Sequence, residues 1–172
     1  MDKAALTKLS YGLYVTGVKN REGFGGCVVD AFMQTTEAPA TAVLCSMQRS
    51  LSNALIKEHS AFTLSVLPTV VDPMVIANFG FQSARAADKW AHVAHTMRGG
   101  LPVLACACAG LLLQVTDARE LSTHTLFFCD IEDAWMREGD PLLYADYQRA
   151  LKPATMAAFQ ALRQKQQSAE VY

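Results

Sequence analysis

The stretch from Phe24 to Asn53 restricts the fold of this chain more than any other part of the sequence. Residues 28–33 and 40–47 have the apolar and β-branched composition of strands, and the turn-forming segment 35–39 separates them. A polar segment then leads into helical spacing of apolar residues over 51–59. A strand that enters a helix through a polar loop favours a phosphate group, because the first N–H groups of a helix have no intrahelical partner and the helix dipole attracts an anion.

The side chains at this helix start are suited to an anion. Ser50, Ser52 and Asn53 supply hydroxyl and amide groups, and Arg49 supplies a positive charge. The simpler interpretation is that Ser50 or Ser52 only caps the helix, since serine is a preferred N-cap residue. The residues by themselves leave both interpretations open, a phosphate site or an ordinary helix cap.

The rest of the chain also has the pattern of short strands with a few helical inserts. Strand-like alternation covers residues 11–18, 61–67, 103–115 with a tight bend at Gly110, and 121–133. Helical spacing covers residues 2–10, 51–59, 70–79 and 83–88, while residues 144–150 and 154–165 are helical or irregular. Because regular alternation of strand and helix is absent, we expect one mainly β domain over residues 1–172, an antiparallel barrel with helical inserts and a fraying polar tail at about 164–172.

Composition and charge exclude several classes of protein. A chain of 172 residues with 51% hydrophobic residues can bury a sizeable core and leaves apolar surface for a subunit interface. A net charge of −1 with mixed signs along the chain provides no basic patch for nucleic acid. The apolar run at 101–115 is too short to span a membrane, and the N-terminus lacks a signal-peptide pattern, so we expect a cytoplasmic protein without membrane contact.

The five cysteines, Cys27, Cys45, Cys106, Cys108 and Cys129, lie in apolar, strand-like surroundings. An odd number without a secretory signal argues against a disulfide framework. Cys106 and Cys108 form a tight pair that would share one face of a strand. Because no second Cys or His pair completes a tetrahedral site, we predict reduced, packed cysteines and no metal.

The sequence contains no nucleophile beside a base, no paired carboxylates at fixed separation and no Walker or GxGxxG loop. If the chain is an enzyme, the reactive atom therefore belongs to a cofactor, and the protein supplies binding and orientation.

Four motifs in the same order resemble those of the flavin reductase family. The first is Asp30 ahead of a Gln-x-Thr-x-x-Pro turn, and the second is the strand, Ser-rich loop and helix that follow this turn. The third covers residues 78–90, and the fourth covers residues 123–131. The third is similar to the family's Phe-Gly-x-x-Ser-Gly-x-x-x-Asp-Lys-Phe, and the fourth to its Asp/Thr-His-x, three hydrophobic residues and Gly-Glu-Val. The match covers about residues 5–147 and resembles in particular the flavin domain of high-molecular-weight rubredoxins and flavoredoxins. It implies an antiparallel Greek-key split β-barrel that binds FMN.

The resemblance also implies the parts of a cofactor site. It places the isoalloxazine edge on Val28, Val29, Asp30 and Ala31, and the flavin ring near Cys45, Ser46 and Met47. The ribityl and phosphate groups would lie near Gln34, Thr35 and Thr36, and the phosphate would be held by Ser50, Ser52 and Asn53. It further implies that Phe81 covers the flavin or packs a dimer, and that Arg85 and Lys89 stand at the cofactor entrance, where either would meet a pyrophosphate. Without the resemblance, Gln34–Thr36 is an ordinary polar turn, and Arg85 and Lys89 are a solvated helix face. Asp30 departs from the family's Asn, and a carboxylate accepts hydrogen bonds but donates none.

His124 is the one catalytic residue that the resemblance implies. From its strand context alone it is a hydrogen-bonded, half-buried histidine. In the family, a histidine at this place faces the flavin and the nicotinamide, so His124 would orient the nicotinamide or stabilise reduced flavin. The leading hypothesis is an FMN-dependent oxidoreductase, a homodimer that takes electrons from NADH or NADPH and passes them to a rubredoxin-type protein, to free flavin for a monooxygenase, or to oxygen. The alternative is a flavin or haem carrier or sensor without turnover.

Overall fold

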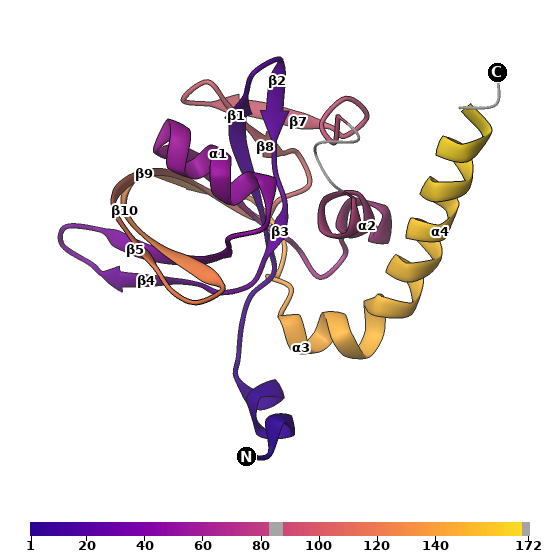
Figure 1. Ribbon diagram of the computed structural model, residues 1–172, viewed down its shortest axis with the longest axis horizontal. Coiled ribbons are helices and arrows are strands. Elements are labelled where there is room, and N and C mark those ends of the chain that lie inside the picture. The colour runs from indigo at the N-terminus through magenta and orange to yellow at the C-terminus, as the bar shows by residue number, and fades with distance from the viewer. Residues whose placement is uncertain (83–87, 170–172) are drawn as a thin grey trace.

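The chain folds around one large, curled antiparallel sheet. The computed structural model describes residues 1–82 and 88–169 (Figure 1). The sheet has the strand order β2-β1-β6-β9-β10-β5-β4, and β3 pairs with β1 beside this path. Its strands are β1 (Tyr14–Asn20), β2 (Gly23–Gly25), β3 (Val28–Val29), β4 (Phe32–Thr36), β5 (Thr41–Met47), β6 (Ala61–Val66), β9 (Ala109–Glu120) and β10 (His124–Met136). The sheet does not close on itself, so the predicted antiparallel split barrel is confirmed.

The opening in the barrel lies where the sequence predicts one continuous strand over 28–33. The structure breaks that strand at Asp30 and Ala31. Before the break β3 pairs with β1, and after it β4 pairs with β5 at the other end of the sheet. The backbone N–H of Cys45 donates to the Ala31 carbonyl at 2.8 Å. One strand therefore becomes two, because the chain crosses here between the two ends of the sheet.

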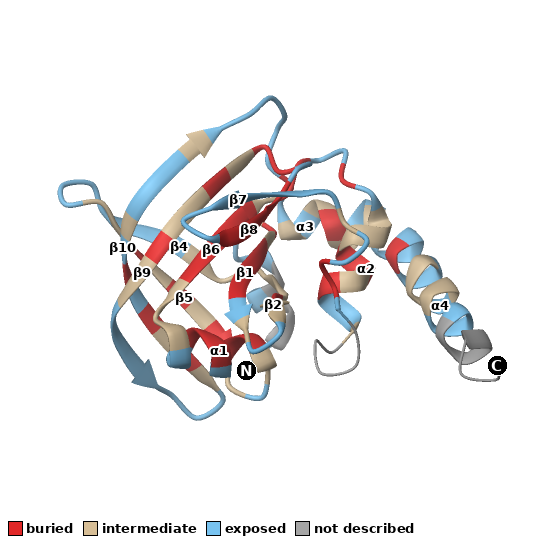
Figure 2. Cartoon of the chain, turned by 90° about the horizontal axis from the view of Figure 1, so that it is seen from above, coloured by how far each residue is buried: buried red, intermediate tan, exposed pale blue. Residues whose placement is uncertain are grey.

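The remaining elements lie outside the sheet, and the first and last helical segments project away from the barrel (Figures 1 and 2). The helical segments are η1 (Lys3–Lys8), α1 (Leu51–His59), α2 (Pro73–Phe81), α3 (Tyr144–Asp146), the π-helix η2 (Tyr147–Leu151) and α4 (Lys152–Ala169). A separate hairpin pairs β7 (His95–Arg98) with β8 (Leu101–Leu104). Leu55 and Ile56 of α1 join Phe62 and Phe127 in the core of the barrel. A second core, which includes Phe79 and Trp90, lies under α2. None of the described helices combines the length and apolar composition needed to cross a membrane.

The expected bend at Gly110 is wrong. The turn lies at residues 105–108, and Gly110 is inside β9, opposite Trp135 of β10. A Cβ atom on Gly110 would lie 2.4 Å from the Trp135 ring, so this glycine makes room for an aromatic side chain on the neighbouring strand.

The expectation that Cys106 and Cys108 share one face of a strand is also wrong. Both lie in the turn between β8 and β9, where Cys106 is exposed and Cys108 is buried. All five cysteines are free thiols. Among the described residues, no group of three or more His, Cys, Asp or Glu side chains is arranged to hold a metal ion.

Candidate functional site

A cavity of about 470 Å³ lies beside the split in the barrel, between β3, the start of α1 and the end of α2. Its charged lining residues are both cationic, Arg49 and Lys89, and none of its described lining residues is a carboxylate. The lining residues are Gly26, Cys27, Val28, Val29, Ser46, Met47, Arg49, Ser50, Leu51, Ser52, Phe79, Gly80, Phe81, Gln82 and Lys89.

The polar end of the cavity is the N-terminus of α1. Ser50 is the N-cap, and its Oγ accepts a hydrogen bond from the Asn53 N–H at 3.1 Å. The Asn53 side chain is buried and donates to the Ser46 carbonyl at 3.2 Å, which ties the helix start to β5. Leu51 and Ser52 form the first turn, whose N–H groups have no intrahelical acceptor, and both line the cavity. The N-cap of α1 therefore also forms part of the cavity wall.

Lys89 lies on another wall of the cavity and is buried, not solvated. Only 3% of its surface is exposed, and its Nζ donates to the carbonyls of Gly26 and Phe79, both at 3.0 Å. Burial lowers the pKa of this ammonium group from its usual 10.5 to about 8, while the nearby Cys27 acts in the opposite direction. An ammonium group has three N–H donors, and the described residues supply these two acceptors.

Trp90 completes the attachment of this segment to the glycine pair Gly25–Gly26 at the end of β2. Its indole Nε1 donates to the Gly25 carbonyl at 3.0 Å, and its ring packs edge-on against Phe79 at 4.8 Å between centroids. A Cβ atom on Gly26 would lie 2.3 Å from the backbone oxygen of Thr16. The glycine therefore brings two backbone segments together and leaves its carbonyl for Lys89.

The residues expected at the isoalloxazine edge and those expected near the ring either line one side of the cavity or lie close to such residues in the chain. Val28, Val29, Ser46 and Met47 line it, whereas Asp30, Ala31 and Cys45 are not among its lining residues. Asp30 is near Cys45: burial, and secondarily the Asp30 carboxylate, raise the pKa of the Cys45 thiol.

The turn at Gln34, Thr35 and Thr36 is separated from this cavity. With Glu37 these residues line a depression of about 290 Å³ at the β4–β5 hairpin. Their side chains bond within the hairpin: Gln34 Nε2 donates to the Thr36 carbonyl at 3.0 Å, and the hydroxyl groups of Thr35 and Thr41 lie 2.7 Å apart. In the single chain they act as a polar turn.

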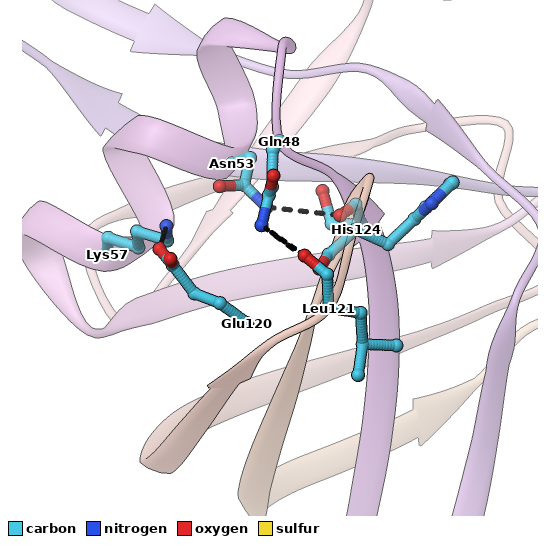
Figure 3. A network of polar contacts seen from close by, with 7 residues as sticks. Gln48, Asn53, Lys57, Glu120, Leu121 and His124 are labelled. Carbon is cyan, nitrogen blue, oxygen red and sulfur yellow. Dashed lines mark hydrogen bonds and ion pairs between the residues drawn. The ribbon is translucent and has the colours of Figure 1, made fainter.

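His124 is half-buried at the start of β10 and lies beside the cavity without lining it. It is the register partner of Met47, which does line the cavity, and directly opposed residues of an antiparallel pair project on the same face. Its Nδ1 lies 2.8 Å from the Thr123 hydroxyl oxygen. Figure 3 shows the ring directed away from the polar contacts around Gln48.

Of the two other residues of the third motif expected near the flavin, Phe81 and Arg85, only Phe81 can be placed. Phe81 lines the cavity, is 41% exposed and contacts Phe159 of α4 at 5.5 Å between ring centroids. Arg85 lies outside the described residues. Sequence reasoning did not assign Cys27, Leu51, Gly80 and Gln82 to the site, although the Gly25–Gly26 pair signalled a close approach of backbone or ligand.

Comparison with known proteins decides the family. The family described as "Flavin reductase like domain" matches residues 6–152. The chain belongs to this family. It is similar to a high molecular weight rubredoxin of Moorella thermoacetica (33% identity, covering 98% of this chain and 76% of that protein) and to a ferric-chelate reductase (NAD(P)H) of Archaeoglobus fulgidus (30% identity, covering 90% and 94%).

Solved structures have the same architecture. The flavin reductase PheA2 in its native state superposes with a TM-score of 0.72 at 25% identity, covering 83% of this chain and 93% of that one. A putative flavin reductase from Haemophilus somnus gives a TM-score of 0.75 at 17% identity, covering 83% and 91%. The chain is therefore an enzyme, an oxidoreductase of the flavin reductase type.

Proposed function

We propose that this enzyme holds FMN in the cavity beside α1, receives electrons from NADH or NADPH, and passes them to a separate acceptor. The observation that carries the proposal is the combination of a capped helix N-terminus with two cationic side chains around a cavity without described carboxylates. Such a lining attracts an anion, and a phosphate ester is the anion that a flavin mononucleotide carries.

The residues present fit the phosphate group. The first-turn N–H groups of Leu51 and Ser52, the hydroxyl groups of Ser50 and Ser52, and the Arg49 guanidinium would surround it. A volume of about 470 Å³ is also within the range of cofactor sites.

The residues at the other end fit a flat, largely apolar ring. Val28, Val29 and Met47 provide apolar surface, and the backbone of the short strand β3 would supply hydrogen-bonding groups. A bound flavin would supply the electron-transfer chemistry. The protein's part is to orient the ring and to leave one side open to the donor.

We assign His124 to the nicotinamide side of the site. It lies beside Met47 at the cavity edge, and its contact with Thr123 restrains the imidazole ring. In this position it orients the donor, and the reaction does not require it to supply a proton.

The proposal includes a homodimer. Met33, Val43 and Phe128 form one row across β4, β5 and β10, because Val43 is the register partner of both other residues. Met33 is 62% exposed and Phe128 37% exposed, so this row presents apolar surface to solvent. Cys45 and Met47 continue the same face toward the cavity. A second copy on this face would cover the surface and narrow the entrance to the site.

The acceptor class follows from the relatives. One relative carries the name of a rubredoxin, and another is the reductase component of a 4-hydroxyphenylacetate 3-monooxygenase from Pseudomonas aeruginosa (27% identity, covering 81% of this chain and 84% of that protein). A rubredoxin-type protein or free flavin delivered to a monooxygenase is the acceptor we propose, in a cytoplasmic setting.

The deciding experiment is an absorption spectrum of the purified protein with FMN, before and after anaerobic addition of NADH or NADPH. Flavin bands that bleach on addition of the donor support the proposal. Bands that persist with both donors indicate a flavin carrier or sensor, and a protein that gains no flavin band with added FMN contradicts the proposal. A Soret band would indicate haem, although no described residue lining the cavity is a histidine.

A further inference from the structure

Gln48 connects the turn before α1 to the tip of the β9–β10 hairpin (Figure 3). Its backbone N–H donates to the Thr123 carbonyl at 3.0 Å. Its side-chain Nε2 donates to the Leu121 carbonyl at 3.0 Å and to the His124 carbonyl at 3.3 Å. One residue therefore makes three hydrogen bonds to a tip only a few residues long.

The chemistry of these contacts requires a side-chain amide. The NH₂ group has two hydrogens, and the two acceptors are the carbonyls at either end of the hairpin tip. These two ends are joined to each other, since the Leu121 N–H donates to the His124 carbonyl at 2.7 Å. A side chain of similar size without donors would lose both contacts.

The same turn forms part of the cavity on its other side. Met47, Arg49 and Ser50 line the cavity, whereas Gln48 between them is not among its lining residues. Gln48 therefore spans from the proposed phosphate site to the hairpin that carries His124.

The position of His124 depends on this hairpin. His124 begins β10 opposite Met47, and the Thr123 hydroxyl that contacts its ring belongs to the hairpin tip. A displaced tip would move both the histidine and its hydrogen-bond partner. An error of 1 Å in the position of a catalytic group is enough to reduce turnover strongly.

We propose that Gln48 is a positioning residue, which fixes His124 relative to the phosphate end of the flavin site. This inference rests on the proposed function, since it requires His124 to face the nicotinamide. Gln48 acts through the hairpin and touches neither the cavity nor the ring of His124.

The test uses Gln48→Met, which keeps the length and lacks the donors without adding charge. Gln114→Met is the matched control, because Gln114 Nε2 donates to the Ser60 carbonyl at 2.8 Å, at the opposite end of α1 from the cavity. We expect Gln48→Met to lower kcat/KM for the nicotinamide donor about tenfold, while its Kd for FMN stays within about twofold of wild type. Gln114→Met should change neither value.

Two further measurements separate positioning from general loss of stability. In flavin-free protein, Gln48→Met should increase hydrogen exchange of the Leu121 amide about tenfold or more relative to the core strands. In a His124→Ala background, Gln48→Met should have no further effect on kcat/KM, because the residue through which it acts is gone.

The inference is overturned if Gln48→Met keeps wild-type kcat/KM, or if its effect is undiminished in the His124→Ala background. These results leave the proposed function intact. A wild-type protein that binds no flavin would instead contradict the proposed function, and this inference with it.

Discussion

At the scale of single residues, Ser50 combines two roles that sequence reasoning treats as alternatives. Its hydroxyl oxygen accepts the Asn53 N–H, which is the function of an N-cap, and the residue also lines the cavity. Capping by Ser50 satisfies the N–H group of Asn53, and the residues before it, Leu51 and Ser52, line the cavity. The same serine therefore serves as the cap and as part of the proposed anion site.

Substitution of Ser50 can separate the two roles. Aspartate caps a helix about as well as serine, but its negative charge repels a phosphate group. We expect Ser50→Asp to keep the free energy of unfolding near wild type and to weaken FMN binding at least about tenfold. Ser50→Ala should lose about 1 kcal/mol of stability. Titration with FMN and riboflavin checks this, since riboflavin lacks the phosphate and should bind Ser50→Asp as it binds wild type.

Because of Lys89, we expect the stability of the protein and its affinity for FMN to change with pH in opposite directions. Its pKa is about 8 in the folded protein, below the usual 10.5, so between these values the unfolded chain binds more protons. The stability of wild type should therefore rise with pH in this window relative to Lys89→Met, by up to about 3 kcal/mol at 1.36 kcal/mol per pKa unit. FMN affinity should fall above pH 8 as the ammonium charge is lost. Denaturant unfolding and FMN titration from pH 7 to 10 would measure stability and affinity. If both quantities change with pH in the same way in wild type and Lys89→Met, the role given to Lys89 is contradicted.

At the scale of elements, the segment after α2 is attached to the β2–β3 connection by side chains that reach backbone carbonyls. Lys89 bonds to the Gly26 carbonyl and Trp90 to the Gly25 carbonyl. The Asn78 side chain holds the same segment from α2, since its Nδ2 donates to the Lys89 carbonyl at 2.7 Å. The Asp-Lys-Trp sequence is therefore a structural connection, and its lysine lines the cavity.

Gly26→Ala tests this connection. The new Cβ would lie 2.3 Å from the Thr16 oxygen and 3.3 Å from Trp90 Nε1, so the two segments would have to separate. We expect a loss of about 1–3 kcal/mol in the free energy of unfolding and weaker FMN binding. Gly23→Ala at the start of β2 is the control, because nothing lies within 4 Å of its added Cβ. Equal stabilities of the two variants in urea would contradict the expectation.

At the scale of the whole molecule, the open sheet leaves an apolar face next to the site. The row Met33, Val43 and Phe128 lies on the outside of the barrel, and Met47 lies further along the same face at the cavity edge. Because the face continues into the cavity wall, dimerisation and flavin binding should be coupled.

Phe128→Asp should convert the proposed dimer to a monomer and weaken FMN binding, since a charge on this face would be buried without a partner. Met136→Asp adds the same charge on the same strand at a residue that is 87% exposed, and it should leave the dimer intact. Analytical ultracentrifugation of wild type, Phe128→Asp and Met136→Asp would measure the oligomeric state of each protein. A monomeric wild type would contradict the homodimer.

The sequence by itself determined most strands of the barrel, the helix α1 and its cap. Alternating apolar residues gave the strands, and α1 occupies the predicted residues 51–59 with Ser50 as its cap. These features depend on side chains a few positions apart, so they are visible in a local pattern. The order of the motifs also indicated the family.

Only the tertiary structure decided which surfaces meet. It buried Lys89, placed Gly110 inside a strand opposite Trp135, broke the strand at Asp30, and brought Gln48 to a hairpin more than seventy positions away in the chain. Each of these outcomes depends on a partner remote in sequence, and residue type alone does not name that partner. A lysine on a predicted helix face looks solvated until the fold shows that two backbone carbonyls and a cavity surround its ammonium group.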